Sequence, residues 1–71
     1  MDPYQELANA IVLRAAEDYR KALKDLSRNP EYKTALNTKA ECELFFQSEW
    51  FRLLTPLDGP MIMKRLQEEV V

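Results

Sequence analysis

Apolar residues recur at helical spacing along the first third of the chain and predict one long helix. They follow steps of three and four residues, which place side chains on one face of an α-helix. Asp2 precedes Pro3, and an N-cap residue followed by proline is a common helix start. We therefore expect a helix from Pro3 to about Arg28. Its apolar face is wide and comprises Leu7, Ile11, Val12, Ala15, Ala16, Tyr19, Ala22, Leu23 and Leu26.

Prolines and a single glycine divide the rest of the chain into two further predicted helices. Asn29-Pro30 favours the end of one helix and the start of the next, because a residue before proline avoids the α region. The second helix is predicted from Pro30 to about Leu54. A break near Gln47-Ser48 is the alternative, since serine is a good N-cap. Capping signals between Thr55 and Pro60 predict a last helix from about Pro60 to Glu69.

These elements predict an all-α fold of two long antiparallel helices plus a short C-terminal helix, which together form a small helical bundle. The 71 residues suffice for one domain, residues 1–71. A chain of this size buries only about 60% of its unfolded surface. Self-association would supply the missing burial, so we expect a two-fold dimer through the first helix, with a monomer as the competing outcome. The predicted core contains Ile11, Ala15, Tyr19, Leu23, Phe46, Trp50, Leu53 and Leu66.

The residue types present argue against catalysis. The chain has no histidine, so Ser-His and Cys-His arrangements are excluded. Its one glycine excludes a Gly-rich phosphate loop. Glu41 and Glu43 flank Cys42 and should raise the pKa of its thiol, which is the wrong direction for a reactive cysteine. We expect no catalytic residue, no metal site and no cofactor.

Charge and hydropathy indicate which classes of partner are less favoured. The formal net charge is −2, whereas a general nucleic-acid binder usually carries a basic excess. The first apolar run stops at Arg14, which is too early for a membrane span or a signal peptide. The sequence therefore predicts a cytoplasmic protein with no membrane partner and with nucleic acid as a less favoured one.

An aromatic run is the first candidate binding feature. Neighbours on a helix lie about 100° apart, so the four aromatic residues between positions 45 and 51 cannot all face one way. Phe46 and Trp50 are expected in the core, while Phe45 and Phe51 are balanced between core and surface. An exposed aromatic at this place would mark a partner site. The candidate partner-binding residues are Phe45, Trp50 and Phe51.

A basic stripe is the second candidate binding feature. Arg20, Lys24 and Arg28 lie one turn apart on one helix face, where arginines could hold an anion by bidentate contacts. A solvated helix face is the simpler interpretation, since cations near a helix C-terminus stabilise its dipole. The candidate anion-binding residues are Arg14, Tyr19, Arg20, Lys24 and Arg28, with Tyr19 stacking on a base.

Two stretches resemble a known group of proteins. They are residues 8–20, Ala-Asn-Ala-Ile-Val-Leu-Arg-Ala-Ala-Glu-Asp-Tyr-Arg, and residues 41–51, Glu-Cys-Glu-Leu-Phe-Phe-Gln-Ser-Glu-Trp-Phe, followed by Leu54-Thr55 and Leu57-Asp58-Gly59. Together they are similar to a family of small helical proteins carried by phages, prophages and mobile elements of Gram-positive bacteria. Pro60 departs from the family pattern, in which a polar helix former follows the glycine. The resemblance implies the cytoplasm of an infected bacterial host and implies no catalytic residue.

Three non-enzymatic functions fit this setting. The first is a host-directed, counter-defence inhibitor that binds a host or phage protein stoichiometrically through an aromatic surface. The second is an oligomeric sponge that sequesters a small anionic, nucleotide-like ligand between adjacent chains. The third is a phage DNA-binding protein of transcription or replication, in which Lys64 and Arg65 would touch DNA, although two cations are few for phosphate binding.

Overall fold

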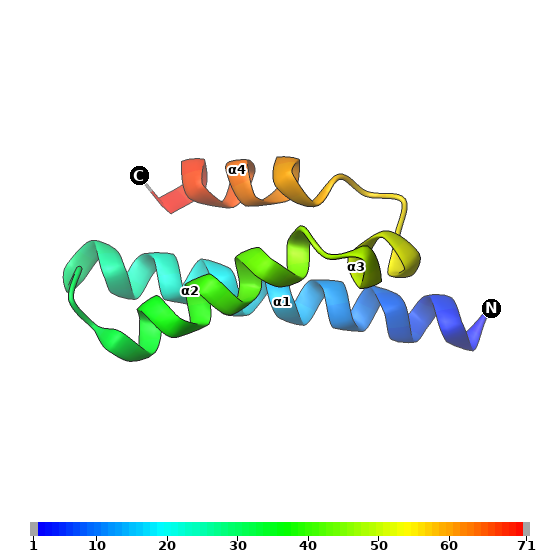
Figure 1. Ribbon diagram of the computed structural model, residues 1–71, viewed down its shortest axis with the longest axis horizontal. Helices are drawn as coiled ribbons and strands as arrows, with labels where there is room; N and C mark the ends of the chain where they lie inside the picture. Colours follow the sequence, from blue (N-terminus) through cyan, green and yellow to red (C-terminus); the bar gives the residue numbers. More distant parts are fainter. Residues whose placement is uncertain (1, 71) are drawn as a thin grey trace.

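Four α-helices make up the fold in the computed structural model, which describes residues 2–70 (Figure 1). They are α1 (Pro3–Arg28), α2 (Lys33–Phe46), α3 (Glu49–Leu54) and α4 (Gly59–Val70). The described residues are 84% helical and contain no strand, which confirms the all-α prediction. One helix is long and the others are shorter. The prediction of a long first helix is therefore confirmed, and the prediction of a long second helix is wrong.

The long first helix has the predicted bounds. The Asp2 carboxylate accepts a hydrogen bond from the Tyr4 backbone N–H at 3.0 Å, and Pro3 occupies the first helical position, where a missing N–H costs nothing. At the other end Asn29 has extended φ and ψ angles of −139° and 90°. Local capping chemistry therefore sets both ends of α1.

The second helix begins later than Pro30, which corrects the prediction. Asn29 uses its backbone carbonyl to accept from the Tyr32 N–H at 3.1 Å and its side chain to accept from the Glu31 N–H at 3.3 Å. These two bonds hold residues 29–32 in a turn, so Pro30 lies in the turn and α2 starts at Lys33. The turn reverses the chain and lets α2 pack antiparallel to α1 (Figure 1).

Ser48 separates α2 from α3, which confirms the alternative break and shows the uninterrupted helix to Leu54 to be wrong. Its hydroxyl accepts from the Phe51 backbone N–H at 3.1 Å and donates to the Phe45 carbonyl at 2.7 Å. With ψ near 159°, Ser48 is extended and cannot continue α2. One hydroxyl therefore closes α2 and caps α3.

The last helix begins at a tight approach between two distant segments. Thr55 and Asp58 hold the preceding turn, by accepting from the Leu57 N–H at 3.2 Å and the Met61 N–H at 3.3 Å. Gly59 is buried, and a Cβ built on it would overlap the Phe46 backbone carbonyl oxygen. Pro60 fits the second position of α4, where no backbone donor is needed.

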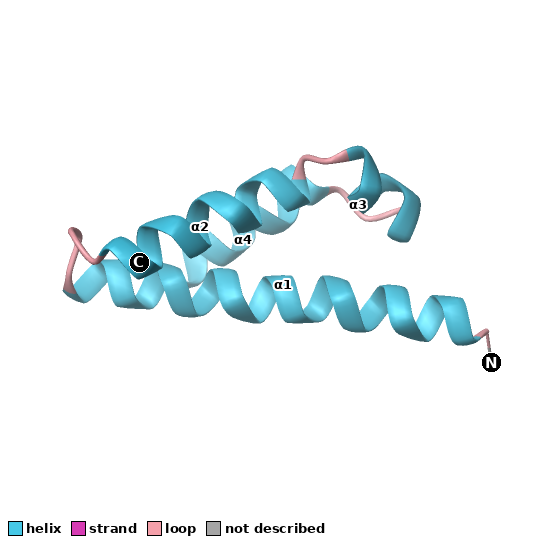
Figure 2. Ribbon diagram, turned by 60° about the horizontal axis from the view of Figure 1, so that its bottom comes forward, coloured by secondary structure: helices cyan, strands magenta, loops and turns pink. Residues whose placement is uncertain are grey.

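The helices pack around a core that lies between α1, α2 and α4, with α3 against the N-terminal half of α1 (Figures 1 and 2). The molecule measures 41 × 20 × 20 Å, and its long axis follows α1. Its central residues are large apolar side chains from all four helices. They are Val12, Tyr19, Cys42, Phe46, Phe51, Met63 and Leu66.

The predicted core is partly correct. Tyr19, Phe46 and Leu66 are buried, and Ile11, Ala15 and Leu23 are half-buried. Trp50 and Leu53 were expected in the core, but they are 54% and 85% exposed. The break at Ser48 is the physical reason, because it redirects α3 so that Phe51 and Leu54 face inward instead.

Candidate protein-binding surface

The short helix α3 presents two large apolar side chains to solvent. Trp50 and Leu53 are three residues apart, so they lie on the same face of the helix. They are 54% and 85% exposed, whereas Phe51 on the inner face is 1% exposed. Ser48 sets this orientation by capping α3 at its start. The exposure of Trp50 and Leu53 therefore follows from the way α3 is fixed to the fold.

An aromatic cluster holds Trp50 in place. The Phe45 ring centroid lies 5.4 Å from that of Trp50 and 5.5 Å from that of Phe51, with interplanar angles of 74° and 86°. Phe46 joins from the core side at 5.7 Å from Phe45. Edge-to-face pairs of this kind contribute roughly 0.5–1.5 kcal/mol beyond their burial. One side of Trp50 is thus fixed against Phe45 while more than half of the residue faces solvent.

The N-terminal half of α1 adds a second row of apolar side chains. Tyr4, Leu7 and Ile11 follow steps of three and four residues and share one helix face. Tyr4 is 84% exposed, Leu7 is 59% exposed and Ile11 is half-buried. This face of α1 therefore remains open to solvent, although its residue types suit a core.

Two hollows show that the rows on α1 and α3 adjoin. A groove of 210 Å³ is lined by Ile11 and Trp50 together with Ala15 and Phe45, and a smaller hollow of 160 Å³ is lined by Tyr4 and Leu53 together with Ala8. Trp50 thus lies over the Ile11 end of the α1 row and Leu53 over the Tyr4 end. We call the combined area the α1–α3 apolar surface. It comprises Tyr4, Leu7, Ile11, Trp50 and Leu53.

Charged residues from both α1 and α2 also line the groove. Arg14, Asp18 and Glu41 line its edge, and the Arg14 Nε atom lies 3.4 Å from the Asp18 Oδ1 atom. Cys42 is at the same groove, where burial raises the pKa of its thiol, with Asp18, Glu41 and Glu43 adding in the same direction. The raised pKa agrees with the sequence expectation, but burial is a larger cause than the neighbouring glutamates.

The three predicted partner-binding residues differ in their exposure to solvent. Trp50 is exposed, Phe45 is half-buried beneath it, and Phe51 is buried in the core. Assignment of Phe51 to a partner site is therefore corrected, since its ring packs against Phe45 and Phe46. Tyr4 and Leu53 were missed as surface residues.

The predicted anion-binding residues do not form one site. The Arg20 Nε atom lies 2.9 Å from the Glu69 Oε2 atom of α4, and Arg14 contacts Asp18. Arg14 and Arg20 are six positions apart, which is about 120° around a helix and about 9 Å along it. Lys24 and Arg28 are exposed near the C-terminal end of α1. The basic side chains are therefore spaced along α1 from residue 14 to residue 28, and Arg14 and Arg20 are engaged with carboxylates.

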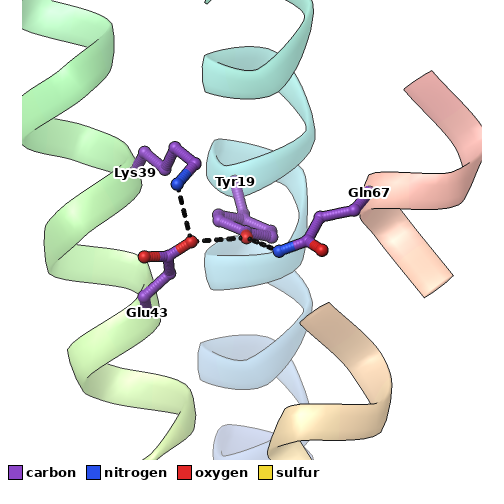
Figure 3. A network of polar contacts seen from close by, with 4 residues as sticks. All are labelled: Tyr19, Lys39, Glu43 and Gln67. Atoms are coloured by element: carbon purple, nitrogen blue, oxygen red, sulfur yellow. Dashed lines mark hydrogen bonds and ion pairs between the residues drawn. The ribbon is translucent and has the colours of Figure 1, made fainter. Parts of the chain in front are cut away.

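Tyr19 belongs to a polar network that joins three helices (Figure 3). Its hydroxyl donates to Glu43 Oε2 at 2.8 Å and accepts from Gln67 Nε2 at 2.8 Å. Lys39 Nζ contacts the same Glu43 oxygen at 2.9 Å. Because the residue is 0% exposed, the expectation that Tyr19 stacks on a bound base is wrong for this fold.

The network shifts two pKa values. Burial raises the pKa of the Tyr19 hydroxyl, and the Glu43 carboxylate acts in the same direction although the hydrogen bond from Gln67 opposes it. Partial burial would also raise the pKa of Glu43, but the hydrogen bonds from Lys39 and Tyr19 and the Lys39 charge lower it below its ordinary value. The network therefore favours a neutral phenol beside an ionised carboxylate.

Two further observations concern the described part of the chain. Residues 2–70 contain no group of three or more cysteine, aspartate or glutamate side chains placed to hold a metal ion. None of the helices formed by these residues combines the length and the apolar character needed to cross a membrane.

The chain matches no protein-family model, no curated protein and no solved structure. The resemblance to small phage and mobile-element proteins therefore stays a prediction.

Proposed function

We propose that this chain is a non-enzymatic protein that acts by stoichiometric binding of another protein through the α1–α3 apolar surface. The observation that carries the proposal is Trp50, which is 54% exposed at the edge of a groove and backed by Phe45. Tryptophan is enriched among the residues that dominate binding energy at protein interfaces. Exposed apolar surface with a charged border is typical of such interfaces.

The geometry reduces the cost of binding. Ordering a mobile side chain on association costs about 0.5–1.5 kcal/mol, and a side chain already held in its bound position avoids much of that cost. Phe45 fixes one side of Trp50, and the Ser48 cap fixes the helix that carries it. Trp50 is therefore a preorganised anchor, which favours binding without a large rearrangement.

The phage setting implied by the sequence supports a host protein as the target, which would make the chain a host-directed inhibitor. The nucleotide-sponge alternative has less support, because Tyr19 is buried and Arg20 contacts Glu69. The DNA-binding alternative also has less support. Lys64 and Arg65 line the same hollow as two glutamates of α4, which would repel phosphate.

A recovery experiment with matched variants tests the proposal. A tagged chain produced in a bacterial host should retain a partner protein at fixed stoichiometry. Trp50→Ala should abolish that recovery. The control is Leu44→Ala, because Leu44 is 73% exposed on α2 outside the surface, so its recovery should equal that of the unchanged protein. Equal recovery of the partner by Trp50→Ala and Leu44→Ala would contradict the proposal.

A further inference from the structure

The single chain exposes more surface than a compact protein of its mass. Its accessible surface is 5532 Å², whereas a folded monomer of 8.3 kDa exposes roughly 4600 Å². Its radius of gyration is 12.7 Å, against about 11 Å for a compact chain of this length. The excess of roughly 900 Å² is close to the area, about 800 Å², that each partner contributes to a standard interface.

The α1–α3 apolar surface is the part of the molecule where apolar side chains lack a covering helix. Four of its five residues are more than half exposed, and all five are apolar or aromatic. By contrast, the C-terminal half of α1 is covered by both α2 and α4 (Figure 2). A partner that supplied the missing cover would have to lie along the N-terminal half of α1.

The row on α1 is complementary to itself when two copies run antiparallel. A two-fold axis that crosses the Leu7–Ile11 face midway between these residues, at the level of residue 9, exchanges positions that are equally distant from it along the helix. Leu7 then lies opposite Ile11 of the partner subunit, and Tyr4 lies opposite Arg14 of the partner subunit. The first pair buries apolar surface, and the second suits a cation against an aromatic ring.

The exposed residues of α3 are paired by the same two-fold axis. Leu53 lies beside Tyr4 and Ala8, before Asn9 along α1, and Trp50 lies beside Ile11 and Ala15, after it. The two-fold axis that pairs Leu7 with Ile11 therefore also brings Leu53 opposite Trp50 of the partner subunit. A single two-fold axis therefore pairs apolar residues on both α1 and α3.

We infer that in the free protein the α1–α3 apolar surface is covered by a second copy of this chain, in an antiparallel two-fold dimer whose axis passes between Leu7 and Ile11. The inference goes beyond the proposed function, because it names what covers the same surface when no target protein is bound. A different target protein binds the dissociated chain and competes with the second copy.

Sedimentation with two pairs of matched variants tests the dimer. The unchanged protein should sediment at micromolar concentration with twice the single-chain mass of 8.3 kDa. Leu7→Glu and Leu53→Glu should sediment as single chains, since each places an unpaired charge in the interface while the exposed position leaves the fold intact. Leu13→Glu and Leu44→Glu are the controls and should remain dimeric. Leu13 is 61% exposed, matching Leu7 at 59%, and it lies about 200° round α1 from Ile11.

Trp50 provides a second readout, because it is the only tryptophan in the chain. Its emission should shift to longer wavelength on dilution of the unchanged protein, as the partner subunit leaves and water reaches the ring. Leu7→Glu should show the shifted emission at every concentration. Leu13→Glu should follow the unchanged protein.

Two results would overturn the inference. One is a single-chain mass for the unchanged protein that stays constant over a tenfold rise in concentration. The other is a dimer that survives both Leu7→Glu and Leu53→Glu, which would place the contact on another face. Neither result decides the proposed function, which fails separately if Trp50→Ala recovers the same partner as Leu44→Ala.

Discussion

Adjacent residues of α3 have opposite environments, and the difference decides what each can do. Trp50 is 54% exposed and Phe51 is 1% exposed, although they are neighbours in the chain. Successive helical residues point about 100° apart, so only one of the pair can face the core. Phe51 packs against both Phe45 and Phe46 and supports the fold, whereas Trp50 is available to a partner.

Alanine substitutions at these two positions should therefore separate stability from binding. Phe51→Ala should cost about 3–5 kcal/mol, because it removes a buried ring from a close-packed core. Trp50→Ala should cost less, about 1–3 kcal/mol, since the residue is already 54% exposed in the folded chain. Urea unfolding followed by circular dichroism measures both. The Leu7→Glu background removes any contribution from self-association, and equal losses for the two variants would contradict the assignment of Phe51 to the core.

Gly59 is required because of a neighbour distant in sequence. A Cβ at this position would overlap the carbonyl oxygen of Phe46, a backbone atom that cannot move without disturbing the end of α2. Gly59→Ala should therefore destabilise the protein by about 1–3 kcal/mol, as overpacking does. Pro60→Ala is the adjacent control at an exposed position and should change stability by less than about 1 kcal/mol. Thermal unfolding decides between this result and the stabilisation that Gly→Ala usually gives inside a helix.

At the scale of elements, the joint between α2 and α3 determines which side chains reach the surface. An uninterrupted helix to Leu54 would direct Trp50 and Leu53 toward the core, as the sequence pattern suggested. The Ser48 hydroxyl instead bonds to both helices, at 2.7 Å to the Phe45 carbonyl and 3.1 Å to the Phe51 N–H. The α1–α3 apolar surface therefore depends on one serine that contacts no partner itself.

Removal of that hydroxyl should loosen α3. Ser48→Ala should cost about 1 kcal/mol, the usual loss for an N-cap, and should move the Trp50 emission because α3 carries that ring. Ser27→Ala is the matched control. Its hydroxyl also donates to a backbone carbonyl, that of Lys24, but it is exposed at the end of α1 and caps no helix. If the two variants had the same stability and emission, the joint would not hold α3.

At the scale of the whole molecule, the Tyr19 network ties the three larger helices together. Tyr19 is on α1, Glu43 is on α2 and Gln67 is on α4, and the phenol joins the other two side chains (Figure 3). The core provides most of the burial, and the hydrogen bonds of one central phenol add directional contacts among these helices. They act together with the Arg20–Glu69 ion pair in holding α4 against the other helices.

The network should make stability depend on pH. The pKa of Glu43 is lowered from 4.5 in the folded chain, so its contribution is present above the unfolded value and is lost as pH falls through the folded value. Unfolding free energy should therefore fall as the pH drops below about 4.5. Glu43→Gln should show a shallower fall over the same range, because it has no proton to take up. Urea midpoints measured at a series of acidic pH values give the comparison, and parallel curves for the two proteins would contradict it.

Local signals in the sequence determined most of the helix ends. Asp2 with Pro3 fixed the start of α1, and Ser48 fixed the break before α3, because these side chains satisfy backbone donors within a few residues of themselves. Helical periodicity likewise identified Tyr19, Phe46 and Leu66 as core, since it depends only on the spacing along one helix.

Only the tertiary structure decided which apolar side chains stay exposed. Periodicity shows that a residue lies on an apolar face, but it does not show whether another helix reaches that face. α4 covers the C-terminal half of α1 and leaves the N-terminal half to the short α3, so Tyr4 and Leu7 remain open while Tyr19 is enclosed. The need for glycine at position 59 has the same origin, because Phe46 approaches it across the fold. Contacts between segments far apart in the chain determine these features, and no local pattern encodes them.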